Sequence, residues 1–184
     1  MALIDQHAAA KAVEDRLSRT SDPRQRGMLE TVAEHLRAEV VADVGRLLAT
    51  LVDDPVYHLW SEGHDVGPRG VDGVLAYYSD LVAARRQVLE FTIERIVVDD
   101  DTVVTEGWIH AINLGAVARA RGWNVDDDEA SYLVTQRVVI FWPFDAEGRM
   151  LGEDGYANLD PNAVRRLADS ELPDAYRQLF AGAH

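Results

Sequence analysis

The sequence contains no cysteine among its 184 residues, which excludes disulfide bonds, cysteine-ligated zinc sites and thiol catalysis. Basic residues are scarce, since 18 Lys and Arg stand against 32 Asp and Glu, for a formal net charge of −14. Such a surface repels phosphate groups, so we expect neither nucleic acid nor an anionic membrane as a partner. The longest apolar run, residues 138–144, is far shorter than the roughly 20 residues that cross a bilayer.

Several short motifs are also missing. No basic and apolar leader is visible at the N-terminus, which predicts a cytoplasmic protein. Neither GxGxxG nor a P-loop string occurs, and GxSxG is absent, so nucleotide cofactors and a serine hydrolase are not expected. His58, His64, Asp65 and His110 carry metal-capable atoms, but HxH and HExxH spacings do not occur. We therefore expect no cofactor and no metal.

The first half of the chain has helical periodicity. Apolar residues recur at three- and four-residue steps over residues 2–20 and 22–51, the latter as one helix or two in sequence, and Asp53-Asp54-Pro55 ends this region. A short strand at 55–60, a glycine-containing loop at 61–70 and a helix from 71 to about 86 follow.

The second half changes to a β pattern. Four strand-like runs, separated by turns or polar loops, are predicted at 88–98, 102–114, 132–144 and 149–158. Helices are predicted to start at Asp160-Pro161 and at Leu172-Pro173-Asp174. Segregated helices and strands indicate an α+β fold, in which a curved antiparallel sheet covered by the N-terminal helices encloses a cone that can hold a small molecule.

Four local strings carry a resemblance to a known fold. They are VDDPV at 52–56, RGVDGVLAYY at 69–78, FDAEGR at 144–149 and GEDGYA at 152–157. In this order they resemble the nuclear transport factor 2-like superfamily, which includes SnoaL-like polyketide cyclases and ketosteroid isomerases. The resemblance implies a cone-shaped α+β barrel domain at 28–160, with helical extensions at 1–27 and 161–184. It also implies a small hydrophobic ligand and a homodimer formed through the outer sheet face.

The resemblance assigns a catalytic base, but the oxyanion-hole aspartate and the first-helix tyrosine of ketosteroid isomerases have no counterpart in this sequence. Ketosteroid isomerases use the aspartate before proline in such a segment as catalytic base, which gives Asp54 that role. Their oxyanion-hole aspartate aligns with Ile140, and their first-helix tyrosine maps near residues 33–35, where no tyrosine occurs. The fold therefore carries over better than the reaction.

Asp54 and His58 are the first candidates for proton transfer. An aspartate at the base of a half-apolar pocket loses hydration, which would raise its pKa and let it accept a proton. Histidine has an ordinary pKa near 6.5 and suits a general acid or base. The plain alternatives are a solvated turn for Asp54 and a hydrogen-bonded structural histidine for His58.

The strands offer a second group of candidates. Alternation puts Glu106, Trp108 and His110 on one face of the run at 102–114, and it puts Arg137 with Phe141 on the next. A buried arginine needs an acidic partner, which Glu106 or Glu153 supplies. Either these residues form a structural salt bridge inside the cone, or His110 and Glu106 relay protons while Arg137 holds an anionic ligand oxygen. The expected catalytic set is Asp54, His58, His110 and Arg137, and the expected substrate-binding set is Trp60, Tyr78, Glu106, Trp108, Phe141, Glu153 and Tyr156.

Three functions remain open from the sequence. The first is a cofactor-independent enzyme that moves protons on a small hydrophobic oxygenated molecule, as an isomerase, dehydratase, cyclase or lyase. The second is a non-catalytic module that binds a similar ligand or another protein. The third is an epoxide hydrolase, known in relatives of this fold, which would need Asp54, Arg137 and Glu106 to converge on a water molecule.

Overall fold

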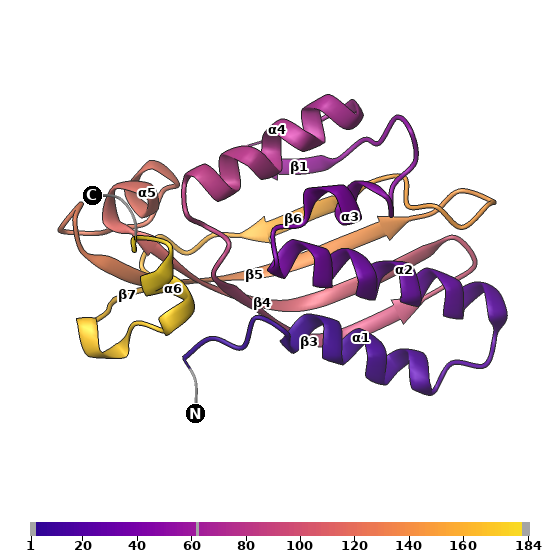
Figure 1. The fold of residues 1–184 in the computed structure, drawn as a ribbon, viewed down its shortest axis with the longest axis horizontal. Coiled ribbons are helices and arrows are strands. Elements are labelled where there is room, and N and C mark those ends of the chain that lie inside the picture. Colours follow the sequence, from indigo (N-terminus) through magenta and orange to yellow (C-terminus); the bar gives the residue numbers. More distant parts are fainter. Residues whose placement is uncertain (1–2, 62, 182–184) are drawn as a thin grey trace.

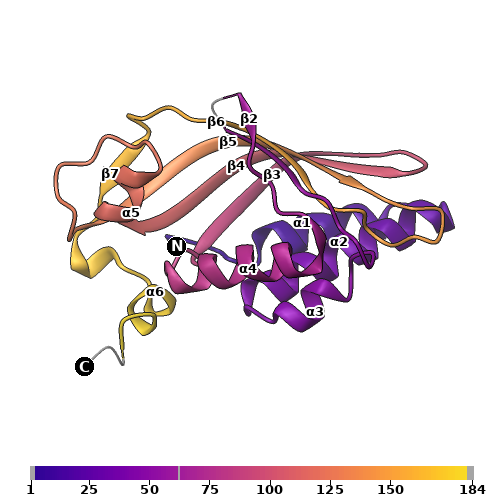
Figure 2. The ribbon, with the colours of Figure 1, turned by 90° about the horizontal axis from the view of Figure 1, so that it is seen from above.

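The computed structural model describes residues 3–61 and 63–181. The two outermost positions of the expected N-terminal extension, one position of the expected loop at 61–70 and the last three of the expected C-terminal extension lie outside the described residues. A seven-stranded curved sheet runs along one side of the molecule, and the N-terminal helices cover one of its faces (Figures 1 and 2). This arrangement confirms the expected α+β fold.

The helices begin where the sequence supplies caps. The carboxylate of Asp22 accepts a hydrogen bond from the backbone N–H of Gln25 at 2.9 Å, and Pro23 occupies the first turn. The region expected as one helix or two is two, because the chain turns at Ala42 with φ of 53°. The helices are α1 (Ala8–Ser18), α2 (Pro23–Val40), α3 (Val44–Leu48), α4 (Gly70–Ala83), α5 (Gly115–Ala120) and α6 (Asp174–Gln178), with a 3₁₀ turn at Asp169–Glu171.

The sheet has the order β2-β1-β6-β5-β4-β3, with β7 also paired to β5. It is mixed rather than antiparallel throughout, because β1 runs parallel to β6. The strands are β1 (His58–Ser61), β2 (His64–Asp65), β3 (Leu89–Val98), β4 (Thr102–Leu114), β5 (Ser131–Pro143), β6 (Asp154–Asn158) and β7 (Val164–Arg166).

Three local expectations differ from the structure. The helix predicted to start at 160 is wrong, since β7 forms there and pairs with residues 132–134 of β5. Within β5, β6 pairs with residues 137–141, and β7 supplies partners for backbone groups of β5 that β6 leaves open. The expected loops at 61–70 and 115–129 contain β2 and α5 respectively.

A β-bulge bends the sheet between Ile93 and Arg95 of β3. Gly107 lies opposite this bulge, and a Cβ there would lie 2.0 Å from the carbonyl oxygen of Thr92. Only glycine therefore lets the two backbones approach, and the bend curves the sheet around its helical side.

The main core fills the space between the helices and the concave face of the sheet. Alternate residues of the long strands point into it, including Val103 of β4 with Val138 and Trp142 of β5. A second cluster continues on this face under α5 and includes Ala111, Trp123 and Tyr132. α1 packs on α2 and β3, and α6 packs on the opposite face near Ile112, so both expected extensions contact the same sheet. In the part of the chain described, no helix has the length and apolar character to cross a bilayer.

Candidate functional site

A cluster of ionisable and hydroxyl groups lies inside the main core. The imidazole of His35 in α2 is fully buried, with Nε2 3.0 Å from Glu153 Oε1 and Nδ1 2.7 Å from Thr50 Oγ1. The hydroxyl of Tyr78 in α4 donates to the same Glu153 oxygen at 3.1 Å. The ring of Trp142 packs edge-on against His35 with centroids 5.8 Å apart. An acid, an imidazole and a phenol thus meet in an apolar interior.

The sequence places each member by a local rule. His35 lies seven residues, about two helical turns, after Met28 and three residues after Val32, on the buried side of α2. Tyr78 belongs to the buried stripe of α4. Glu153 is positioned by Gly152, where a Cβ would lie 1.8 Å from Val56 O, so only glycine allows the two segments to meet.

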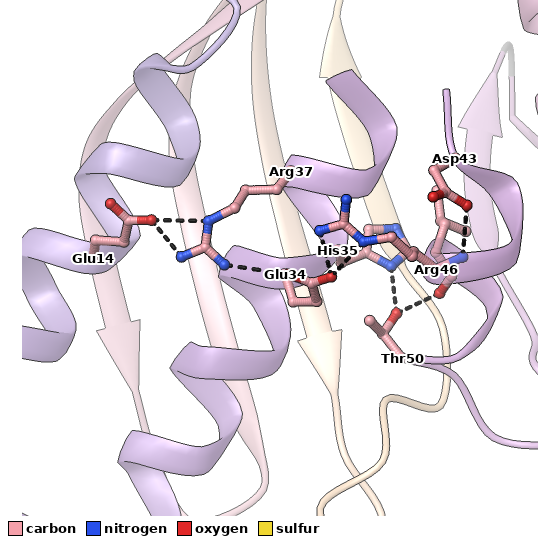
Figure 3. Close-up of polar contacts among 8 residues, drawn as sticks. Glu14, Glu34, His35, Arg37, Asp43, Arg46 and Thr50 are labelled. Carbon is pink, nitrogen blue, oxygen red and sulfur yellow. Dashed lines mark hydrogen bonds and ion pairs between the residues drawn. The ribbon is translucent and has the colours of Figure 1, made fainter. Parts of the chain in front are cut away.

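Exposed ion pairs hold the helices over this cluster. Arg37 of α2 binds Glu14 of α1, and Glu34 of α2 accepts from Arg46 of α3 at 2.7 Å (Figure 3). The same view shows the side chains of His35 and Thr50 pointing toward each other beneath these pairs. The pairs connect three helices, although each contributes little stability because it is exposed.

The hydrogen bonds of Thr50 fix the direction of its contact with His35. The hydroxyl of Thr50 donates its single hydrogen to Leu47 O at 2.6 Å, so its oxygen accepts from Nδ1–H of His35. Nε2 of His35 and Oε1 of Glu153 lie 3.0 Å apart, so they form a hydrogen bond when either atom carries a proton.

Burial changes the acidity of the neighbouring groups. It raises the pKa of the Glu39 carboxyl to about 7, with further repulsion from Glu153 and partial compensation by His35. Burial also raises the pKa of Tyr57 and Tyr78 well above the usual tyrosine value, so both phenols remain hydrogen-bond donors at neutral pH. The Tyr57 hydroxyl has no hydrogen-bond partner among the described residues.

Little free space remains beside the cluster. A cavity of about 10 Å³ lies next to Glu39, Tyr78 and Gln87, between α2, α3 and α4. This volume holds about one water molecule. A larger depression of about 530 Å³ is open to solvent around residues 119–126 and shares no residue with the cluster.

Of the residues expected from the sequence, Tyr78 and Glu153 belong to this cluster. Asp54 is exposed, and a Cβ on Gly70 at the start of α4 would lie 3.4 Å from its carboxylate oxygen. The desolvation expected for Asp54 is therefore not found. His58 is half-exposed and its Nδ1 lies 2.8 Å from Asp65 Oδ2, which also accepts from Arg69 at 2.9 Å.

The second expected group lies on the outer face of the sheet. Arg137 donates to Glu106 at 2.8 Å and lies over the ring of Trp108 at 5.1 Å, so the expected ion pair forms, but outside the cone. His110 Nδ1 lies 3.0 Å from Thr135 Oγ1. The sequence pattern assigned these residues to a common face correctly, and only the position of the helices makes that face the outer one. Trp60, Phe141 and Tyr156 expose 45%, 38% and 47% of their surface there.

Two further geometric expectations can be compared with the structure. Asp54 lies beside the start of α4, whereas Arg137 and Glu106 are paired on the outer sheet face, so the convergence that epoxide hydrolysis requires is not found. Across residues 3–61 and 63–181, no three His, Asp or Glu side chains gather closely enough to hold a metal ion.

Sequence reasoning missed four members of the interior cluster: His35, Glu39, Thr50 and Tyr57. A usable signal existed for His35, because a histidine on the apolar stripe of an amphipathic helix must find buried partners. Tyr57 alternates with His58, and the inner face of this segment is the one that carries Tyr57. Thr50 and Glu39 had no comparable signal.

The family model described as the SnoaL-like domain matches residues 32–152. The chain belongs to the SnoaL-like domain family. No curated protein sequence matches the chain. The family match confirms the resemblance seen in the sequence.

Solved structures share the fold of this SnoaL-like protein. A Shewanella putrefaciens protein named as a SnoaL-like polyketide cyclase superposes with a TM-score of 0.61 at 13% identity, covering 85% of this chain and 90% of its own. A similarly named Shewanella denitrificans protein gives 0.58 at 16% identity over 71% and 90%. A Mycobacterium tuberculosis protein in complex with estradiol-17beta-hemisuccinate gives 0.53 at 21% identity over 76% and 98%. At these identities the similarity establishes the fold alone.

Proposed function

We propose that this SnoaL-like protein binds a small hydrophobic oxygenated molecule between its helices and sheet and performs cofactor-independent acid–base chemistry on it. The observation that carries the proposal is the contact between His35 and Glu153 in the interior, whose Nε2 and Oε1 atoms lie 3.0 Å apart. An imidazole beside a carboxylate can take a proton from a ligand and return it, which is general acid–base catalysis.

Each polar group of the cluster has a role in this reaction. Glu153 or His35 removes a proton from the ligand and returns it at another atom. Tyr57, whose hydroxyl has no partner among the described residues, donates a hydrogen bond to a ligand oxygen as negative charge develops there. Glu39, with a pKa of about 7, exchanges protons with the pair. The reaction class is isomerisation, dehydration, cyclisation or carbon–carbon cleavage.

Ligand entry requires the interior to open, since the present cavity of about 10 Å³ admits about one water molecule. Displacement of α4 would move Tyr78 and enlarge the cavity against α2. The Mycobacterium tuberculosis relative and a computationally designed 17-OHP binder of the same fold support a flat polycyclic ligand as the first class to examine.

A thermal-shift screen of steroids, polyketide-like aromatics and terpenoids tests binding, because a ligand that binds only the folded state raises its Tm. Turnover of each hit is then measured in the wild type and in Glu153→Gln and His35→Gln. We expect kcat to fall by about 10²-fold or more in both variants. Glu147→Gln, an exposed carboxylate in the 145–148 turn, is the matched control and should retain full activity. Full activity in Glu153→Gln would refute the proposal.

A second candidate is a non-catalytic binding module. The specific observation in its favour is that His35, Thr50, Tyr78 and Glu153 already satisfy one another in a nearly filled interior. In that case ligands would raise the Tm without conversion, and His35→Gln would lower stability without affecting any reaction. Product analysis by mass spectrometry over a long incubation separates the two functions.

We also propose that two copies of the chain associate through the outer sheet face. Trp60, Tyr156 and Val139 follow one another across β1, β6 and β5, and Phe141 packs edge-on against Tyr156 at 5.9 Å. Exposed aromatic side chains on one sheet face favour a self-complementary contact. The expectation of a cytoplasmic location stays a prediction.

A further inference from the structure

Several buried side-chain atoms without hydrogen-bond partners lie in the interior between the helices and the concave face of the sheet, most of them toward α5. Within the described residues such side-chain atoms are Tyr57 OH, Arg86 Nε, Gln87 Oε1, Asn113 Nδ2 and Oδ1, and Trp123 Nε1. Buried polar groups are nearly always hydrogen-bonded, so several unpaired ones close together indicate a place where a ligand or water supplies the hydrogen-bond partners. Tyr57 belongs to the His35 cluster, and the other residues come from the segments between α4 and β3, the end of β4, and the loop after α5.

Strand register places three of these residues on the concave face. Leu89 of β3 pairs with Ala111 of β4, and the Ile112 N–H donates to Val88 O at 3.2 Å. Continued by two residues, this antiparallel register puts Gln87 opposite Asn113, on the same face as Leu89 and Ala111. Trp123 packs against Ala111 in the same cluster. Gln87, Asn113 and Trp123 therefore share the inner face.

Two arginines at this end have no acidic partner among the residues that the structure describes. Every other arginine in the described chain donates a side-chain hydrogen bond or forms an ion pair, except Arg85, which stacks on Phe180 at 4.2 Å. Arg121 stacks on Trp123 at 5.3 Å, and Arg86 has its Nε buried. In a chain of net charge −14, acidic residues are in excess, yet none of those in residues 3–61 and 63–181 forms an ion pair with either guanidinium group.

The charges of the two arginines act on one tyrosine, Tyr77. Burial raises the pKa of Tyr77 to about 12, and the charges of Arg86 and Arg121 both act against this rise. Desolvation and the nearby Arg86 lower the pKa of Arg121 to about 10, although part of its side chain reaches solvent. Arg121 therefore remains charged at neutral pH and lies at the rim.

Aromatic contacts and the small cavity connect the arginine end with the His35 cluster. The Tyr77 ring lies 5.2 Å from Tyr78 and 6.4 Å from Tyr57, in edge and tilted contacts. The cavity of about 10 Å³ is lined by both Tyr78 and Gln87. A ligand that opens this cavity would thus have proton-transfer groups along one end and guanidinium groups at the other.

We propose that Arg86 and Arg121, together with Asn113 and Trp123, form an anion-binding subsite at the mouth of the hollow, and that the ligand is a flat hydrophobic molecule with a terminal carboxylate or similar anionic group. The inference rests on the proposed function and specifies its ligand class. A guanidinium group binds a carboxylate through two parallel hydrogen bonds, and the Asn113 amide and Trp123 N–H are additional unpaired donors. The anion supplies the partner that both arginines lack.

A matched pair of fluorescent probes tests the subsite. The anionic probe is 8-anilinonaphthalene-1-sulfonate, and the neutral probe is N-phenyl-1-naphthylamine, which has the same aromatic body without the charge. We expect Arg86→Gln and Arg121→Gln each to weaken binding of the anionic probe by about ten- to a hundredfold, because a charge-assisted contact is lost. Binding of the neutral probe should change by less than about twofold. Naphthalene-2-carboxylate should displace the anionic probe, whereas naphthalene-2-carboxamide should not.

Arg85→Gln is the control, since it removes the same charge one residue away, from a side chain that stacks on Phe180. It should leave both affinities unchanged. The ligand-free Tm of Arg86→Gln should be equal to or above that of the wild type, because the substitution removes an unpaired cation; a large loss would indicate a structural arginine and overturn the proposal. Arg121→Gln, at the exposed rim, provides a variant whose folding is not at risk.

The outcomes separate this inference from the function on which it rests. If the arginine variants weaken binding of both probes equally, or do not weaken binding of the anionic probe, the proposed subsite is overturned. Binding of the neutral probe to the wild type would still support a hydrophobic ligand site. If neither probe binds the wild type, the hollow does not admit flat ligands, and the proposed function and the subsite both fail.

Discussion

Glu39 makes the stability of this protein depend on pH in a predictable direction. Its carboxyl pKa rises from 4.5 to about 7 in the folded state, first because of burial and then because of Glu153. Between these values the folded protein retains a proton that the unfolded chain has released, so stability falls as pH increases from about 4.5 to 7. Glu39→Gln cannot ionise and should lack this loss.

The size of the effect follows from the displaced pKa. At about 1.4 kcal/mol per pH unit, the full displacement corresponds to about 3 kcal/mol. Solvent reaches part of the Glu39 side chain and reduces this value, so we expect about 1–3 kcal/mol. The free energy of unfolding of Glu39→Gln relative to wild type should increase by that amount between pH 4 and pH 8. Urea denaturation followed by tryptophan fluorescence, at several pH values, measures it.

Glu30→Gln is the matched control, because Glu30 is an exposed carboxylate on the same helix with a weak contact to Arg26 at 3.6 Å. It should change the free energy of unfolding by less than about 0.5 kcal/mol at any pH. A difference between Glu39→Gln and wild type that is constant with pH, or that decreases toward alkaline pH, would refute the reasoning.

The remaining predictions concern the phenols, the bulge and the outer face. Tyr57→Phe should leave the stability of the ligand-free protein unchanged or raise it by about 1 kcal/mol, while lowering ligand affinity. Tyr78→Phe removes a hydrogen bond to Glu153 and should lower the free energy of unfolding by about 1–2 kcal/mol in denaturation experiments. Gly107→Ala should destabilise by at least about 2 kcal/mol because its Cβ meets Thr92 O, whereas Gly27→Ala in α2, with free space around it, should stabilise by up to about 1 kcal/mol. Tyr156→Glu should convert a dimer to a monomer in light scattering, while an exposed substitution on the helical side, Val41→Glu, should not; a wild-type monomer at high concentration would exclude that interface.

Much of the fold could be predicted from local patterns. The strand expected at 102–114 is β4 with the same bounds, and burial alternates along its first half. The pattern also grouped Glu106, Trp108 and His110 correctly on one face. β7 could not be predicted, because its three residues form a strand only where β6 ends and leaves the edge of β5 open.

The candidate site was less accessible to sequence reasoning. Tyr78 and Glu153 were expected to bind a ligand, and both lie in the interior cluster, but their common partner is His35, 118 positions from Glu153 in the chain. The catalytic assignment of Asp54 came from the resemblance alone and stays a prediction, for a side chain that the structure places in solvent.

The sequence by itself determined the α+β class, the long strands, the pairing of residues by face and the excess of negative charge, because these depend on periodicity and composition within short segments. Only the tertiary structure decided which sheet face is covered. The helices pack on one side of the bulged sheet, and this choice leaves Arg137 outside while it buries His35, Tyr57 and Glu153 together. Burial of that kind is a property of how distant segments meet, so no local pattern in the chain contains it.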